Sequence, residues 1–161
     1  MYKFKIKVWD KFNKKAFEKD IITVLKDRQQ DYYTLYFFDN AEEMYAWFDK
    51  RYGKSDPQEH EYLGMVKYMA RNYYEDEAFS KIIDYSKSCG IILLNLEDYS
   101  AEILCHEVSH ASSWYFGYRI KQKNKIFTEI DYNELYCYIT GNIAKQVNAK
   151  YYEILDKKAT E

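Results

Sequence analysis

The chain has little of what marks disordered, repetitive or membrane-spanning proteins. Its 161 residues contain one proline and five glycines. No stretch approaches the roughly 20 consecutive apolar residues of a transmembrane helix, and the first five residues lack the apolar core of a signal peptide. We therefore expect a cytoplasmic protein without membrane contacts. Its length predicts a single domain over residues 1–161.

Cysteines are few, and neither sign of charge dominates. Cys89, Cys105 and Cys137 are odd in number and widely spaced, which fits neither a disulfide framework nor a CxxC zinc cluster. The 24 Lys and Arg residues against 26 Asp and Glu residues leave a net charge of -2, so no long-range field favours nucleic acid. We expect reduced thiols and no nucleic-acid partner. The 19 tyrosines require that buried hydroxyls find hydrogen-bond partners.

Apolar patterns predict strands early in the chain. Alternation over residues 2–8 indicates a half-buried strand with lysines on its solvated side, and the aromatic run 32–38 indicates a second. The apolar run 90–96 indicates a buried strand. Residues 16–26 fit either a helix or a strand, and Asp56 before Pro57 opens a candidate helix.

N-terminal capping signals predict three further helices. They are a helix over 41–51 capped by Asn40, a helix over 101–116 capped by Asp98 or Ser100, and a last helix that opens at Asp131 and runs past Gln146. Strands first and helices last predict an α+β domain in which a small mixed sheet packs on helices.

The segment His106-Glu107-Val108-Ser109-His110 matches the pattern H-E-x-x-H. Residues four apart on a helix share one face, so both imidazoles can reach one Zn²⁺ about 2 Å from each nitrogen. Glu107 points elsewhere and can act as general base on a zinc-bound water. The alternative is that both histidines are ordinary polar positions. The histidines lie opposite the apolar stripe of the helix, but Ile103 and Trp114 flank them, so we expect this second face to be covered as well. Two histidines that point into a covered face favour the metal site.

A catalytic zinc site needs a third protein ligand, and no histidine follows His110. Glu134 is the best candidate, because it shares a helix face with Cys137, Gly141 and other small residues that would allow close approach of two helices. The alternative is that Glu134 only completes a capping box with Asp131. Glu129 and Asp131 are rival carboxylates, but both lie before or at the expected cap.

With its downstream segment Asn133-Glu134-Leu135-Tyr136-Cys137-Tyr138-Ile139-Thr140-Gly141, the motif resembles the small zincin-like proteins of bacteriophages and mobile elements, which are similar to minimal gluzincins. Those proteins pair H-E-x-x-H-A with an E-x-x-C-Y-x-x-G helix. The match covers about residues 90–147. The resemblance implies His106, His110 and Glu134 as zinc ligands and Glu107 as general base. It also implies that the strand around Leu93 is the edge along which an extended substrate lies.

One departure from many gluzincins is the absence of a histidine beyond the glutamate to stabilise the oxyanion. Tyr138, one turn after Glu134, is the candidate replacement, although a packing role fits it equally well. Cys105 and Cys137 flank the motif residues, and we expect them to be small buried hydrophobes. His60 has no partner at ligand spacing.

The sequence therefore predicts a zinc-dependent hydrolase, a metallopeptidase that cleaves a peptide or protein substrate through a zinc-bound water. The alternative is a zinc-stabilised phage protein that binds a host or phage protein without turnover. Retention of Glu107 favours the enzyme, because a structural site has no use for a base. A third class, a tyrosine-rich structural protein, would require both motifs to arise by coincidence.

Overall fold

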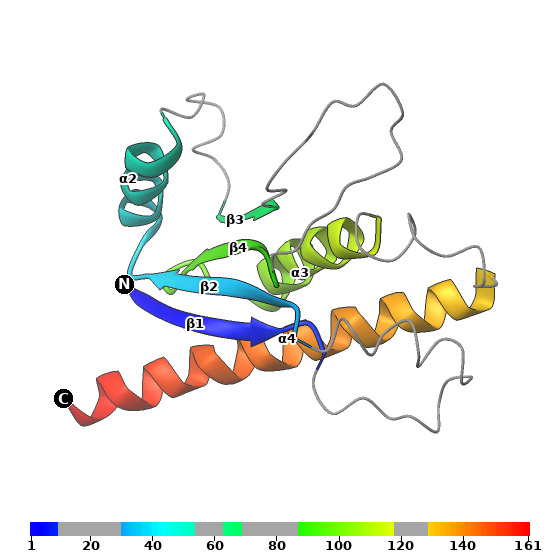
Figure 1. The fold of residues 1–161 in the computed structure, drawn as a ribbon. Helices are drawn as coiled ribbons and strands as arrows, with labels where there is room; N and C mark the ends of the chain where they lie inside the picture. The colour runs from blue at the N-terminus through cyan, green and yellow to red at the C-terminus, as the bar shows by residue number, and fades with distance from the viewer. Residues whose placement is uncertain (10–29, 54–62, 69–86, 118–128) are drawn as a thin grey trace.

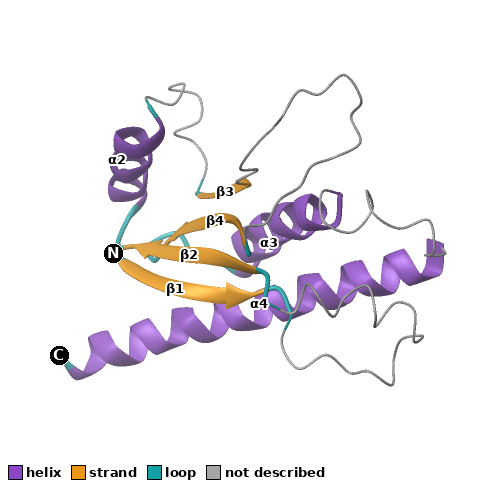
Figure 2. Cartoon of the chain, viewed as in Figure 1, coloured by secondary structure: helices purple, strands orange, loops and turns teal. Residues whose placement is uncertain are grey.

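The protein is an α+β structure in which one mixed sheet lies between helices, as Figures 1 and 2 show. The computed structural model describes residues 1–9, 30–53, 63–68, 87–117 and 129–161, with residues 129–132 described by backbone alone. The expected segments 16–26 and 56–59, and His60, lie outside the described residues. No helix in the described part is long and apolar enough to cross a bilayer.

Four described strands form the sheet in the order β1-β2-β4-β3. They are β1 (Tyr2–Lys7), β2 (Tyr32–Phe38), β3 (Gly64–Tyr68) and β4 (Ser88–Asn95). β1 pairs antiparallel with β2, β2 parallel with β4, and β3 antiparallel with β4. The three predicted strands are confirmed within two residues. β3 was not predicted, and its place beside β4 means that the strand around Leu93 is not an edge; among the described strands the edge on this side is β3.

Alternate residues of the central strands enter two different cores. On β2, Tyr33, Leu35 and Phe37 belong to one apolar cluster, whereas Tyr36 and Phe38 belong to the other. The period of two on a strand directs successive side chains to opposite faces of the sheet. Helix α2 (Ala41–Tyr52) covers the second cluster, and helices α3 (Ala101–Tyr115) and α4 (Glu129–Thr160) cover the first.

The capping signals of the first two helices are confirmed. Asn40 accepts a hydrogen bond from the Glu43 backbone at 2.9 Å, and Gly53 ends α2 with φ 91°. Ser100, not Asp98, caps α3, since its hydroxyl accepts from the Ile103 backbone at 3.2 Å. These bonds satisfy backbone donors that the first turn of a helix leaves free.

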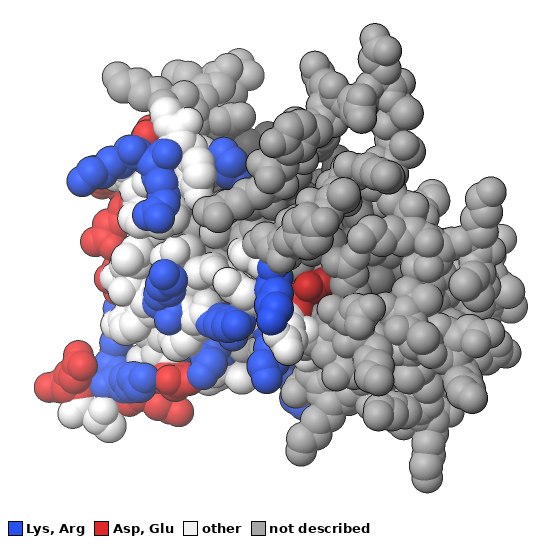
Figure 3. Space-filling model, viewed as in Figure 1, with Lys and Arg blue, Asp and Glu red and all other residues white. Residues whose placement is uncertain are grey.

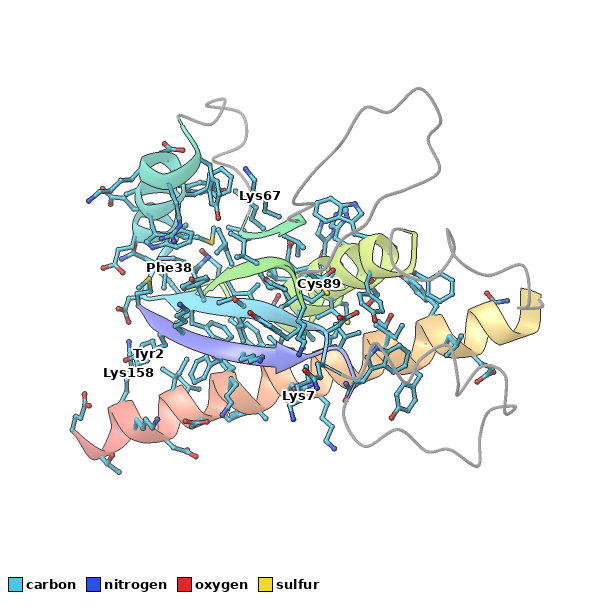
Figure 4. The ribbon with its side chains drawn as sticks, in the orientation of Figure 1. Tyr2, Lys7, Phe38, Lys67, Cys89 and Lys158 are labelled. Carbon is cyan, nitrogen blue, oxygen red and sulfur yellow. The ribbon has the colours of Figure 1, made fainter. Side chains whose placement is uncertain are left out.

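The last helix begins earlier than predicted. α4 is continuous over 32 residues from Glu129, so Asp131 lies inside the helix and is not its cap. At 1.5 Å per residue the helix is about 48 Å long, and Figure 1 shows it running beneath the whole length of β1. Gln146 both donates to and accepts from the Lys7 backbone, at 2.7 and 3.0 Å, where Figure 4 shows Lys7 next to α4.

The far end of α4 is joined to the sheet by charged side chains. Lys158 forms an ion pair with Asp39 and lies 5.9 Å from the ring centre of Tyr2, beside which Figure 4 places it. Lys3, Lys5 and Lys7 are exposed on β1, as expected, and Figure 3 shows Lys and Arg side chains gathered on this side of the molecule. Lys and Arg side chains also lie over α2, and at the C-terminal end of α4 they stand beside Asp and Glu side chains.

Buried tyrosines hold α3 to the sheet through their hydroxyls. Tyr33 on β2 donates to the Ala111 carbonyl at 2.8 Å. Tyr115 donates to the buried Asp31 carboxylate at 2.9 Å and accepts from the Trp9 indole at 2.8 Å. No buried side-chain nitrogen or oxygen of the described residues lacks a partner. The expectation that a tyrosine-rich core satisfies its hydroxyls is confirmed for these residues.

We expect Tyr115→Phe to lower the free energy of unfolding by about 1–3 kcal/mol, because it removes the hydroxyl between two buried polar groups. Urea denaturation measures the change. Tyr152→Phe is the control, since Tyr152 is 56% exposed, and it should have an effect near zero. Equal stability of both variants would contradict the role given to the Tyr115 hydroxyl.

Candidate functional site

The motif lies in the middle of α3, whose two sides have different surroundings. Leu104, Val108, Ala111 and Tyr115 are buried against the sheet and α4, as the apolar stripe predicted, whereas Ala101 is exposed. His106 and His110 are exposed on the other side, so the expectation that this second face is covered is wrong for both histidines. Burial of the stripe sets the rotation of α3 about its axis, and this rotation presents both imidazoles to solvent.

The two imidazoles lie where a pair of metal ligands would lie. Their Nε2 atoms are 3.1 Å apart, and their ring centres are 4.7 Å apart. Two nitrogens bound to one tetrahedral zinc at about 2.0–2.1 Å are separated by about 3.3–3.4 Å. One imidazole can donate a hydrogen bond to the other at the observed distance, and this distance is also close to the separation of two nitrogens on one zinc ion. The pair therefore fits two positions of a zinc site.

Glu107 is buried beside these exposed histidines. Its side chain is 6% exposed, and no described residue donates a hydrogen bond to its carboxylate. Burial raises the pKa of the Glu107 carboxyl to about 7, while the neighbouring His106 opposes this increase. A carboxyl group with a pKa near 7 can exchange a proton close to neutral pH, which is what a general base requires.

Gly64, the first residue of β3, is in contact with the Glu107 side chain. A Cβ added at Gly64 would lie 2.7 Å from Cγ and 3.1 Å from Cδ of Glu107, and 3.0 Å from Leu94 Cδ2. Contacts this short are not tolerated without movement of a neighbour. Strand β3, which was not predicted, therefore leaves room for the Glu107 side chain because its first residue is a glycine.

Asn95, at the end of β4, connects the strand that precedes the motif to β3. Its buried amide donates to the Leu63 carbonyl at 2.9 Å, and its oxygen accepts from the Asp98 backbone at 2.9 Å. One side chain thus holds the start of β3 and the loop before α3. The local pattern did not predict that Asn95 connects these two segments, because it lies within an otherwise apolar strand pattern.

Two cavities open on either side of His106. One, of about 360 Å³, lies between β3 and the first half of α3, and Gly64, Asp98 and Glu107 are among its lining residues. We call it the acidic cavity. The other, of about 490 Å³, follows the exposed side of α3 past Cys105, Ser109 and His110, and we call it the histidine groove. His106 and Glu102 line both, so the two cavities share a border at the motif.

The structure does not bring Glu134 to the histidines. Glu134 is exposed on α4, on the side opposite the buried residues Leu135, Ile139 and Ile143. Within the described ranges no three His, Cys, Asp or Glu side chains form a group that could hold a metal. Two of the three predicted ligands, His106 and His110, are therefore adjacent, and the third ligand stays a prediction.

The expected close approach of α4 through its small residues is wrong. Cys137 and Gly141 are exposed, and a Cβ added at Gly141 would meet no described atom within 4 Å. α4 packs instead through its branched aliphatic residues, which bury more apolar area than the small ones. Cys105 is also exposed, so both cysteines near the motif differ from the buried hydrophobes that we expected, and only Cys89 is buried.

The two tyrosines of the downstream motif have different surroundings. The Tyr138 ring stacks on the Trp9 ring against the main core, with their centres 6.1 Å apart. Tyr138 therefore has a packing role, which was the alternative to stabilising the oxyanion. The Tyr136 hydroxyl lies 3.2 Å from Ser113 Oγ and 3.4 Å from the Ser109 carbonyl, and both serines line the histidine groove, whereas Tyr136 itself does not. Sequence analysis missed Tyr136, because only the contact between α3 and α4 distinguishes it from the other tyrosines.

Comparison with protein-family models, curated proteins and solved structures found no match for this chain. The resemblance to small zincin-like proteins therefore depends on the two sequence motifs alone. What the structure adds is the arrangement of the side chains around the first motif.

We expect Gly64→Ala to lower the free energy of unfolding by about 1–3 kcal/mol, because the new methyl group overlaps Glu107 Cγ. In a Glu107→Ala background the same change should cost at least about 0.5 kcal/mol less, since the overlapping atoms are gone. Urea denaturation of the four proteins gives this double-mutant cycle. An identical cost of Gly64→Ala in both backgrounds would show that the two residues are not in contact.

Proposed function

We propose that this chain is a zinc-dependent hydrolase that cleaves a peptide or amide bond, with His106 and His110 as metal ligands. The observation that carries the proposal is the 3.1 Å separation of their Nε2 atoms on the exposed side of α3. The buried Glu107 carboxyl group beside them supports the proposal, because a catalytic zinc site uses a general base and a structural zinc site does not.

The roles of the chain's own groups follow from their positions. Bound zinc would lower the pKa of a water to about 7 and polarise the substrate carbonyl. Glu107 takes the proton of the attacking water and passes it to the leaving nitrogen. His106 and His110 would hold the metal as neutral imidazoles. The Tyr136 hydroxyl contacts Ser113, a residue of the histidine groove, whereas the Tyr138 ring packs on Trp9, so Tyr136 is the better candidate to donate a hydrogen bond to the oxyanion.

Glu134 remains the proposed third ligand because of the motif resemblance. Its helix contacts α3 through Tyr136, but Glu134 itself faces away from that contact, since residues two apart on a helix lie on nearly opposite sides. The proposal thus requires the first turns of α4 to present Glu134 to the histidines when the metal is bound. The role of Glu134 as third ligand is therefore tested separately, with the variant Glu134→Ala.

Purified protein should contain close to one zinc per chain, and His106→Ala or His110→Ala should lose most of it. Metal analysis of protein prepared without chelator measures this directly. Ser109→Ala, an exposed change between the two histidines, should keep the metal. Absence of stoichiometric transition metal from the wild-type protein would rule out the zinc site.

The same measurement tests the third ligand. Glu134→Ala should weaken zinc binding far more than Glu129→Ala or Asp131→Ala, which remove the rival carboxylates. Retention of zinc by Glu134→Ala, with loss in the histidine variants, would show that another group completes the site.

Glu107→Gln should retain zinc but lose hydrolysis by at least about 100-fold, because the amide has the size of the carboxylate and cannot take the proton. Mass spectrometry of products formed in a cell lysate finds the cleaved bond. Glu97→Gln, at an exposed residue outside both cavities, is the matched control and should cleave at the wild-type rate. Full activity of Glu107→Gln on an identified substrate would refute the mechanism.

A further inference from the structure

The acidic cavity has two walls that are held in place by one buried side chain. The start of β3, with Leu63 and Gly64, forms one wall, and the first half of α3 forms the other. The Asn95 amide bonds both to Leu63 and to Asp98, which lines the cavity beside the α3 N-terminus. The cavity borders His106, so a group bound in it lies next to the proposed reaction centre.

Three carboxyl groups line this cavity, contributed by Asp98, Glu102 and Glu107, and no Lys or Arg is among its described lining residues. None of the three forms an ion pair with another described residue. The lysines described above lie on the sheet and on α4. An uncompensated group of like charges facing one cavity attracts a cation from solution.

Glu107 is the innermost of the three and points to a ligand independently of the other two. The Glu107 residue is only 6% exposed, yet it lines the cavity, and no described donor forms a hydrogen bond with its carboxyl group. A carboxylate in such surroundings costs free energy unless a cation or donor accompanies it. A positively charged ligand in the cavity would supply that partner.

The remaining wall is apolar and selects the shape of the cation. Leu63 is 44% exposed at the cavity, and Ile103 is half-buried there. The carboxyl groups do not converge closely enough to form a metal-binding group. A volume of about 360 Å³ with acidic groups on one side and aliphatic surface on the other suits a long side chain with an aliphatic stem and a cationic end.

We propose that the acidic cavity binds a lysine or arginine side chain of the substrate and thereby selects basic peptides for cleavage. This inference rests on the proposed function, because it places the basic residue beside the bond that the zinc site would cleave. Leu63 and Ile103 contact the aliphatic stem. Asp98 and Glu102 pair with the cationic end, and Glu107 lies at the inner side of the same cavity.

Four peptides of the form Ala-Ala-X-Ala-Ala-amide, each with the same fluorophore on the N-terminus, test the cavity, with X as lysine, arginine, norleucine or glutamate. Norleucine keeps the stem without the charge. Fluorescence anisotropy measures binding to the full chain as purified, and mass spectrometry checks that each peptide is intact at the end. We expect the lysine or arginine peptide to bind at least ten-fold more tightly than norleucine, and the glutamate peptide to bind most weakly.

The preference should fall several-fold in Asp98→Asn and in Glu102→Gln and disappear in the double variant. Glu97→Gln, next to Asp98 but outside the cavity, should leave it unchanged. Equal affinity for norleucine and the basic peptides would overturn the proposal. So would a preference that survives the double variant, or absence of binding at millimolar peptide.

These outcomes are separate from those of the zinc measurements. A protein that carries zinc and cleaves a substrate but binds all four peptides equally loses only the cavity assignment. A protein that prefers basic peptides but contains no metal loses the assignment as a hydrolase and the role of the cavity in cleavage, and keeps only the cavity as a binding site for basic side chains.

Discussion

The rotation of α3 about its own axis is the constraint on which both cavities depend. Val108, Ala111 and Tyr115 are almost fully buried against the sheet and α4, and the hydroxyls of Tyr33 and Tyr115 tie the same side of the helix to β2 and to Asp31. A different rotation would expose these apolar groups and leave the tyrosine hydroxyls without partners. The histidines face outward because the opposite side of α3 is buried in the core.

The same rotation gives neighbouring residues different chemical surroundings. His106 is exposed and can receive a metal, whereas Glu107, about 100° further around the helix, is buried beneath β3. Gly64 makes this burial possible, since any larger residue at the start of β3 would overlap the glutamate. The site therefore depends on a contact between residues 43 positions apart in the sequence (107 − 64 = 43). A local pattern cannot reveal such a contact.

Local signals predicted most of the regular structure and the first half of the site. Strand β2, the Asn40 cap and the rotation of α3 all follow from period and capping chemistry, which act within a few residues. Errors arose where tertiary packing decided the outcome. The Glu134 side of α4 was expected to pack because of its small residues, but Leu135, Ile139 and Ile143 are the buried ones. Gly64, Asn95 and Tyr136 matter through long-range contacts alone.

A crystal structure of the zinc-loaded protein, with diffraction data on both sides of the zinc absorption edge, tests the central claim most directly. The account predicts one anomalous peak about 2.0–2.1 Å from the Nε2 atoms of both His106 and His110. The same map would show which further group completes the coordination. A zinc peak elsewhere on the chain, with the two imidazoles hydrogen-bonded to each other, would contradict the account.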